Sequence, residues 1–496
     1  MAVPENIRKI PRPKNTIVQG HTNKDGVTHY VVRSRAGTVY SNGRSRPKNG
    51  PVIGYIIDGK YVAIDDVPPV EPREVQMRTW AVERFALDHT SDVIDDLRVA
   101  YGERYGEIAY TMALLRVRHP DLKNSRMKRD YDESLLSEVY PNLGMSKNSV
   151  SEHLKDLGSS VVGIRKFIEC RLERIGKDSV QVIDGTLIHD ESRVNNLSNV
   201  SRKTRGRGGK DISMIFAFDI EKMEPTCYAV YPGNMVDSKA YSDFIEFNDL
   251  RDVMLMGDKA FTRNAAKKQF SGERHLHHFF PLRRNSKVID KFRLHNYNTP
   301  LRTYRSISYC IGHDTDNGLW YYSFRDTERA AEEESDFLDS CRRNGKGFSD
   351  EDLSKMKEVW GTMIFQSDCE MSAENAYDLY KKRWMIEEMF RLYKHIEDFD
   401  DTRVQSDVSV NGEYLINFVS TIVTARLMRL FLESGLLETM TFGEIMEVLR
   451  RSLKFKDCDG EWVFRAQTDK EKDALRTLDL MPKVLPKRRG RPLKNR

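Results

Sequence analysis

The order of strand-like and helix-like segments after residue 178 most constrains the fold of this chain. Three short apolar runs with strand character come in succession, at SVQVIDGTLIHD, DISMIFAFD and PTCYAVYPGN. A helical stretch (SKAYSDFIEFNDLRD), a buried strand (VMLMGDKAF), a short helix (RNAAKKQF) and a fifth strand (HHFFPLR) follow. Strands that are first consecutive and then alternate with helices predict a mixed α/β sheet.

A second pattern lies in the segment YKKRWMIEEMFRLYK. Four polar residues in it are separated by three, four and seven positions: Tyr380, Arg383, Glu387 and Lys394. On an α-helix this spacing puts all four side chains within about 60° of one another, beside an apolar arc. One carboxylate among basic side chains suits a site that holds a metal ion and binds phosphate around it. An ordinary solvated helix face with weak ion pairs fits the same residues.

Two aspartates stand out by their placement: Asp184 follows VQVI, inside or at the end of a predicted buried strand, and Asp258 follows VMLMG at the end of another. Acids at such positions are costly to bury unless they are hydrogen-bonded, paired or bound to a metal, and α/β folds place sites at strand ends. Together with Glu387 they form a three-carboxylate set that suits Mg²⁺ or Mn²⁺, and two such ions can assist phosphoryl transfer. Either aspartate alone also fits a turn or cap.

Other groups compete for the same role. Several acids near the same strands remain alternatives: Asp190, Asp211, Asp219 and Asp237. Of these, Asp237 precedes a helix and fits loop or cap chemistry best. The histidines of HLHH (275–278) lack a partner set with zinc spacing, so they do not indicate a zinc site.

These motifs resemble those of DDE transposases of the bacterial insertion-sequence class, whose signature is Tyr-x2-Arg-x3-Glu-x6-Lys. The residues from Tyr380 to Lys394 match that spacing in full. Asp184-Gly185-Thr186 resembles the first Asp motif of the family, and Gly257-Asp258-Lys259-Ala260-Phe261 resembles the second, with Ala260 where Gly is typical. The resemblance covers roughly residues 178–400.

The resemblance implies an RNase H-like catalytic core with a β-rich insertion between the second Asp and the Glu. Asp184, Asp258 and Glu387 would be catalytic and would hold Mg²⁺ or Mn²⁺, as a pair of ions. The DNA phosphates would be held by the other signature residues, Tyr380, Arg383 and Lys394, because Arg binds phosphate bidentately and Lys acts as a point charge.

We therefore expect a transposase that binds the ends of a mobile double-stranded DNA element, cleaves them and transfers the strands to target DNA, in a cut-and-paste reaction. The family further implies a homodimer in a synaptic complex. An RNase H-like DNA nuclease without strand transfer, and an inactive transposase-derived DNA-binding protein, remain alternatives.

Basic residues gather at the two ends of the chain. Residues 1–50 hold ten Lys and Arg against two acids, and residues 483–496 hold seven and no acid, although the net charge of the chain is only +5. Such arms favour polyanion binding, while solubilising tails are the alternative. A third basic stretch, SRKTRGRGGK (201–210), fits a loop along DNA or a solvated hairpin.

The tail contains Arg489-Gly490-Arg491-Pro492, which resembles the core of an AT-hook. Glycine lets the backbone lie deep in a narrow minor groove, and the flanking arginines enter it. A tail that binds phosphates without sequence preference fits equally well.

Pattern and composition predict five regions: a basic N-terminal β-unit (1–75), a helical DNA-end-binding region (76–177), the catalytic core (178–400) with its insertion at about 283–360, a helical region (401–482) and the basic tail (483–496). The six cysteines form no CxxC pair, which argues against a disulfide framework. The apolar stretch YLINFVSTIVTARLMRLFL contains two arginines and predicts a buried helix rather than a membrane span. With no signal peptide visible, we expect a cytoplasmic, nucleoid-associated prokaryotic protein without a membrane partner.

Overall fold

The structure is a computed structural model. It describes residues 3–481 except 23–27, 42, 67–75, 177, 191, 193, 203, 205, 207, 236, 260, 346, 384–403 and 458–459. The chain divides into two compact units, Met1–Val75 and Gln76–Arg496.

The first unit is an antiparallel sheet with the strand order β1-β2-β3-β4. Its elements are α1 (Glu5–Arg8), β1 (Thr16–Thr22), β2 (Thr28–Ser41), β3 (Arg44–Ile57), β4 (Lys60–Ala63) and the 3-10 turn η1 (Ile64–Asp66). Val18 of β1 lies opposite Val32 of β2, and both side chains are buried. These β-branched residues form the centre of a small core.

The second unit begins with a short strand and a helical layer. The elements are β5 (Met77–Thr79), α2 (Ala81–His89), α3 (Ser91–Tyr101), α4 (Glu103–Arg118), η2 (Asn124–Arg126), α5 (Met127–Asp132), α6 (Leu136–Val139), α7 (Lys147–Ser159) and α8 (Val161–Glu173). The Ser146 side chain caps α7 by accepting a hydrogen bond from the Ser149 backbone N–H.

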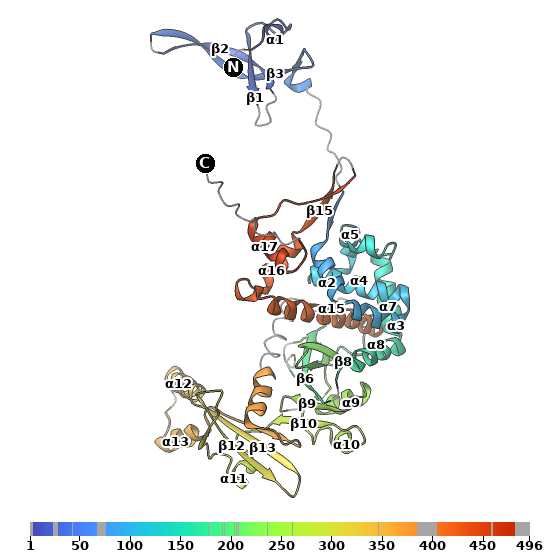
Figure 1. The fold of residues 1–496 in the computed structure, drawn as a ribbon, viewed down its shortest axis with the longest axis vertical. Coiled ribbons are helices and arrows are strands. Elements are labelled where there is room, and N and C mark those ends of the chain that lie inside the picture. The colour runs from blue at the N-terminus through green and yellow to red at the C-terminus, as the bar shows by residue number, and fades with distance from the viewer. Residues whose placement is uncertain are drawn as a thin grey trace, which may run out of the picture. The chain divides into compact units, whose positions relative to one another are not determined.

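A mixed sheet forms the centre of the second unit, as the sequence predicts (Figure 1). Among the described residues its order is β11-β12-β13-β14-β10-β9-β6-β7-β8. The core elements are β6 (Ser179–His189), β7 (Asp211–Asp219), β8 (Glu224–Pro232), α9 (Asp237–Phe247), β9 (Val253–Gly257), α10 (Lys267–Phe270) and β10 (His277–Pro281). Strands β6, β7 and β8 are antiparallel, whereas β9 runs parallel to both β6 and β10.

Further strands extend this sheet on the β10 side. They and their helices are α11 (Lys287–Lys291), β11 (Thr299–Pro300), β12 (Ile307–Asp314), β13 (Leu319–Asp326), α12 (Thr327–Asn344), α13 (Asp350–Val359) and β14 (Thr362–Ser367). Strand β14 pairs with both β13 and β10, so it joins the added strands to the core. Residues 373–383, which follow β14, are helical.

The C-terminal part contains α15 (Asp407–Glu433), η3 (Leu436–Glu438), α16 (Phe442–Arg450), β15 (Leu453–Lys456), β16 (Trp462–Phe464) and α17 (Asp469–Thr477). The sequence predicts this part to be mainly helical, but β15 and β16 pair with each other and β15 pairs with β5. Strands of four and three residues are too short to show an alternating pattern.

Helix α15 is long and apolar enough to cross a membrane by length and composition alone. In the structure 72% of its most apolar window is buried, against α4, α7 and β8. The predicted buried helix is therefore confirmed.

Charged side chains are buried where the helical layer meets the sheet. Arg171 of α8 lies 2.8 Å from Asp92 of α3 and 2.7 Å from Glu224 of β8. Arg426 of α15 contacts the same two acids at 3.1 and 2.8 Å. Burial opposes the charged form of Asp92, but hydrogen bonds from Arg426 and Arg171 outweigh it and lower its pKa to about 2. The network therefore links α3, α8 and α15 to β8.

Two glycines bring α7 and α15 into backbone contact. A Cβ atom added at Gly158 would lie 1.9 Å from the Val408 carbonyl oxygen, and one added at Gly412 would lie 2.0 Å from the Leu154 carbonyl oxygen. No neighbouring side chain can move to relieve such a clash, so both positions require glycine.

We expect Gly158→Ala to lower the free energy of unfolding by about 1–3 kcal/mol, because its methyl group must force α7 away from α15. Gly443→Ala is the matched control: its helical site has open space, and it should be neutral or stabilising by up to about 1 kcal/mol. Urea denaturation measures both; equal stability of Gly158→Ala and the unsubstituted protein would contradict the close packing.

Candidate active site

The parallel pairing of β6 and β9 brings the two predicted aspartates side by side. The last registered pair is Ile183 with Gly257, so the next positions along the two strands are Asp184 and Asp258. Residues in register on neighbouring strands lie on the same face, about 4.8 Å apart. Asp184 is half-buried and Asp258 is exposed.

Local contacts hold both carboxylates. Asp184 Oδ1 accepts a hydrogen bond from the Gly185 backbone N–H at 2.9 Å, and Asp258 Oδ1 accepts one from the Lys259 backbone N–H at 2.6 Å. Two oriented carboxylates on one face offer the oxygen ligands that hard divalent cations prefer, so the residues present fit such an ion.

The sequence around Asp258 explains its position. The Phe261 backbone N–H donates to the Asp258 carbonyl oxygen, which closes a turn, and the Phe261 ring is buried against Tyr241. A Cβ atom at Gly257 would lie 2.7 Å from Phe261 Cβ. Gly257 therefore allows Phe261 to fold back, and the turn places Asp258 at the strand end.

The competing acids have structural partners. Asp190 accepts hydrogen bonds from the Asn195 side chain and the Ser192 backbone N–H. Asp219 accepts two from backbone N–H groups in the β7–β8 turn, and Asp211 accepts one from Ser201. Buried acids satisfied in this way organise loops, which accounts for these three of the four competing acids, whereas the register sets Asp184, within β6, beside Asp258, directly after β9.

Tyr380 and Arg383 lie on the helix that follows β14. Tyr380 packs against Phe365 of β14 and against Tyr377, which is almost fully buried on the same helix. Glu387 and Lys394 lie outside the described residues, as do Arg489, Gly490, Arg491 and Pro492 of the tail. Their predicted roles stay predictions.

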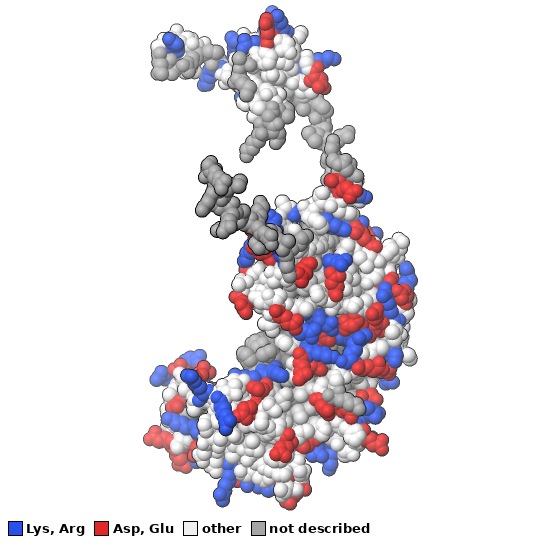
Figure 2. Space-filling view, viewed as in Figure 1, with Lys and Arg blue, Asp and Glu red and all other residues white. Residues whose placement is uncertain are grey.

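A cleft of about 650 Å³ brings part of the predicted site together. Asp258, Tyr380 and Arg383 all line it, and its remaining charged lining residues are Lys259, Arg284, Arg329 and Glu333. Four cationic side chains against two acids make the cleft net positive, which suits a phosphate backbone. Elsewhere, on the face of the second unit shown in Figure 2, acidic and basic side chains are interspersed.

The cleft also contains an ion-pair cluster that the sequence does not predict. Arg284 forms a bidentate pair with Glu333 of α12, at 2.9 and 2.8 Å, and Arg329 of α12 donates to the same carboxylate at 3.0 Å. Partial burial opposes ionisation of Glu333, but hydrogen bonds from Arg284 and the Gly361 backbone N–H hold its pKa at about 2. Two guanidinium groups around one carboxylate leave a net positive charge.

Arg329 connects this cluster to the helix at 373–383, because its Nη1 donates a 3.0 Å hydrogen bond to the Tyr380 hydroxyl. We call this helix the signature helix, since Tyr380 and Arg383 of the predicted signature lie on it. Arg329 and Glu333 are four residues apart, which in sequence indicates only an ordinary helical ion pair. Arg284 lies three residues beyond β10, and nothing in its local sequence distinguishes it from the neighbouring Arg283.

The family comparison agrees with this geometry. Residues 175–421 match the model of the transposase DDE domain. The chain carries a DDE transposase domain. It is accordingly a DNA transposase, an enzyme that cleaves DNA and transfers strands, and domains of this kind generally use divalent metal ions.

A search of solved structures found a piggyBac transposase in a synaptic complex with hairpin DNA, at 12% identity and a TM-score of 0.39, over 76% of this chain and 82% of that one. No curated protein matches the transposase sequence.

We expect Glu333→Gln to destabilise the transposase by about 1.5–3 kcal/mol, because it weakens charge-assisted hydrogen bonds to Arg284 and Arg329. Glu332→Gln, at the adjacent exposed position, should change stability by less than about 0.5 kcal/mol. Thermal and urea unfolding measure both. Equal effects of the two substitutions would show that the cluster contributes no more than the helix surface does.

Proposed function

We propose that the chain is the cut-and-paste transposase of a bacterial insertion sequence, and that Asp184, Asp258 and Glu387 are its catalytic, metal-holding residues. The adjacent placement of Asp184 and Asp258 by the β6–β9 register carries this proposal. The strand order β8-β7-β6-β9-β10, three antiparallel strands followed by two parallel ones, supports an RNase H-like core.

Glu387 is assigned from its position on the signature helix. If the helix at 373–383 continues, the spacing of four residues from Arg383 and seven from Tyr380 would put Glu387 on their side of it, and Glu388 would point about 100° away. Both Tyr380 and Arg383 line the cleft at Asp258, which supports Glu387 as the third carboxylate.

The three carboxylates would hold Mg²⁺ or Mn²⁺, as two ions. When bound, such ions activate water or a 3′-hydroxyl and stabilise the departing oxygen.

The protein side chains position the DNA. In this proposal Arg383 and Lys394 bind phosphates of the element end, and the Tyr380 hydroxyl, held by Arg329, orients one of them. Arg329 adds a guanidinium from α12 to the same cleft. Guanidinium groups bind phosphate through paired N–H donors, so they fix its direction as well as its distance.

DNA ends would be bound by the basic unit at residues 1–75 and the helical region at 76–177. The basic tail, with its AT-hook-like residues 489–492, would add contacts in A·T-rich minor grooves. A homodimer would bridge the two ends in a synaptic complex, in the cytoplasm and at the nucleoid.

The test uses the DNA that flanks the coding region as substrate, starting from terminal inverted repeats found there. We expect Asp184→Asn, Asp258→Asn and Glu387→Gln each to reduce end cleavage at least about 10³-fold, equal to roughly 4 kcal/mol of transition-state stabilisation. End binding, measured by gel shift, should persist because the phosphate contacts remain.

Glu388→Gln is the matched control, since it removes the same charge from the neighbouring position of the helix. It should cleave within a few-fold of the unsubstituted enzyme. Cleavage that persists in Glu387→Gln, or an equal loss in Glu388→Gln, would rule out the assignment of the third carboxylate.

A further inference from the structure

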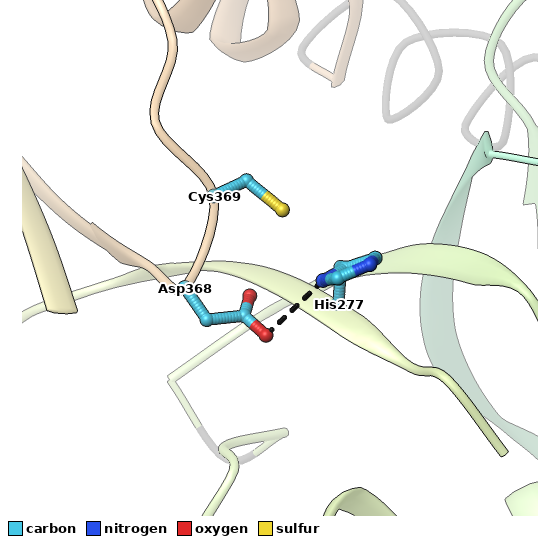
Figure 3. A group of neighbouring side chains, drawn as sticks. All are labelled: His277, Asp368 and Cys369. Atoms are coloured by element: carbon cyan, nitrogen blue, oxygen red, sulfur yellow. Dashed lines mark hydrogen bonds and ion pairs between the residues drawn. The ribbon is translucent and has the colours of Figure 1, made fainter. Parts of the chain in front are cut away.

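Three side chains that can bind metal converge where β10 begins and β14 ends (Figure 3). They are His277, at the start of β10, and Asp368 and Cys369, directly after β14. Strands β10 and β14 are antiparallel, and their register, continued past the pair Phe279–Ser367, sets His277 opposite Cys369. The three ligand atoms lie within 4.8 Å of one another, and His277 Nδ1 is 3.3 Å from Asp368 Oδ2.

One oxygen of the Asp368 carboxylate is held by His278. Its Oδ1 accepts a 2.8 Å hydrogen bond from the His278 backbone N–H and lies 3.0 Å from Nδ1 of the fully buried His278 ring. The other oxygen, Oδ2, faces His277. Outer partners that orient one carboxylate oxygen while the other faces a ligand cluster are typical of metal sites.

The loop that carries Cys369 is also fixed. The Cys369 backbone N–H donates to Ser367 Oγ at 3.0 Å, and its carbonyl oxygen accepts from the Tyr322 hydroxyl at 3.2 Å. The same hydroxyl accepts from the Met371 backbone N–H at 2.7 Å. The thiol is therefore presented from a preorganised backbone.

The thiol is poorly suited to reaction on its own. Burial, together with the charges of Asp368 and Asp178, raises the pKa of Cys369 to about 11. A neutral thiol at pH 7 is a weak nucleophile.

We propose that His277, Asp368 and Cys369 form a Zn²⁺ site. One nitrogen, one oxygen and one sulfur donor suit zinc in a tetrahedral arrangement, with water as the fourth ligand, whereas a sulfur donor disfavours Mg²⁺ and Mn²⁺. Binding converts the Cys369 thiol to a thiolate, and its proton is released to solvent.

This site is separate from the proposed catalytic one. His277 is registered with Met254 at the start of β9, and Asp258 lies four residues further along the same direction, which is about 13 Å. Zinc here would fix the junction between β14 and the helix at 373–383, which carries Tyr380 and Arg383. Its role would be to hold the signature helix in place.

The experiment is a titration of the purified full-length protein with Co²⁺, which reports thiolate ligation by a charge-transfer absorption in the near ultraviolet. We expect one equivalent to give this band and Zn²⁺ to abolish it by competition. Oxygen-only sites give no such band, so an unchanged band in Asp184→Asn/Asp258→Asn separates the two sites. Absence of the band in the unsubstituted protein would overturn the proposal.

Variants identify the ligands. Cys369→Ser should lose the band, and His277→Ala should weaken Co²⁺ binding at least tenfold, while Cys341→Ser, at a half-buried cysteine on α12, should keep both. Zn²⁺ should also raise the Tm of the unsubstituted protein and of Cys341→Ser but not of Cys369→Ser. A band that survives in Cys369→Ser would contradict the site. If that variant does not fold, the His277→Ala titration decides.

Discussion

The parallel pairing of β6 with β9 is the interaction on which the proposed active site depends. Because side chains alternate along a strand, a slip of one residue would turn Asp258 to the opposite face from Asp184. The sequence fixes the end of β9 through Gly257, whose missing side chain lets Phe261 fold back against Tyr241. The carboxylate pair is thus a product of packing behind the site as much as of the two acids themselves.

Strand β14 connects that core to the rest of the cleft. It pairs with β10 on one side and with β13 on the other, and the signature helix follows it directly. Through this arrangement α12, which lies between β13 and β14 in the chain, places Arg329 against Tyr380. The segment between β10 and β14 therefore does more than extend the sheet, since its Arg329 supplies a cation and a contact with Tyr380 to the cleft that Asp258 lines. The proposed zinc ligands where β10 begins and β14 ends would hold the same connection.

Much of the fold follows from the sequence because local patterns suffice for it: the successive strands β6, β7 and β8, the helix α9 and the buried strand β9 all have clear periodicity. The positions of Asp184 and Asp258 after apolar runs marked them as candidates, because α/β folds place sites at strand ends, but their adjacency follows only from the β6–β9 register. What the sequence could not show is contact between distant segments. In the sequence, Arg329 and Glu333 indicate only a surface ion pair, and the contact with Arg284 appears only in the fold. His277 has no zinc spacing in the sequence because Asp368 and Cys369 follow another strand, β14. Glu387, Lys394 and the AT-hook-like tail remain predictions from their motifs.

The most direct test of the central claim, that one metal-binding site joins Asp184 and Asp258, is Fe²⁺-directed cleavage of the protein backbone. With hydrogen peroxide and ascorbate added, Fe²⁺ bound in place of Mg²⁺ reduces the peroxide to hydroxide and a hydroxyl radical, and ascorbate restores the Fe²⁺. The radicals cut the chain near the ion, and mass spectrometry locates the cuts. The account predicts cuts beside Asp184 and beside Asp258 in the same sample, both suppressed by excess Mg²⁺ and both lost in Asp258→Asn. Cuts at only one of the two positions, or cuts that excess Mg²⁺ does not suppress, would contradict it.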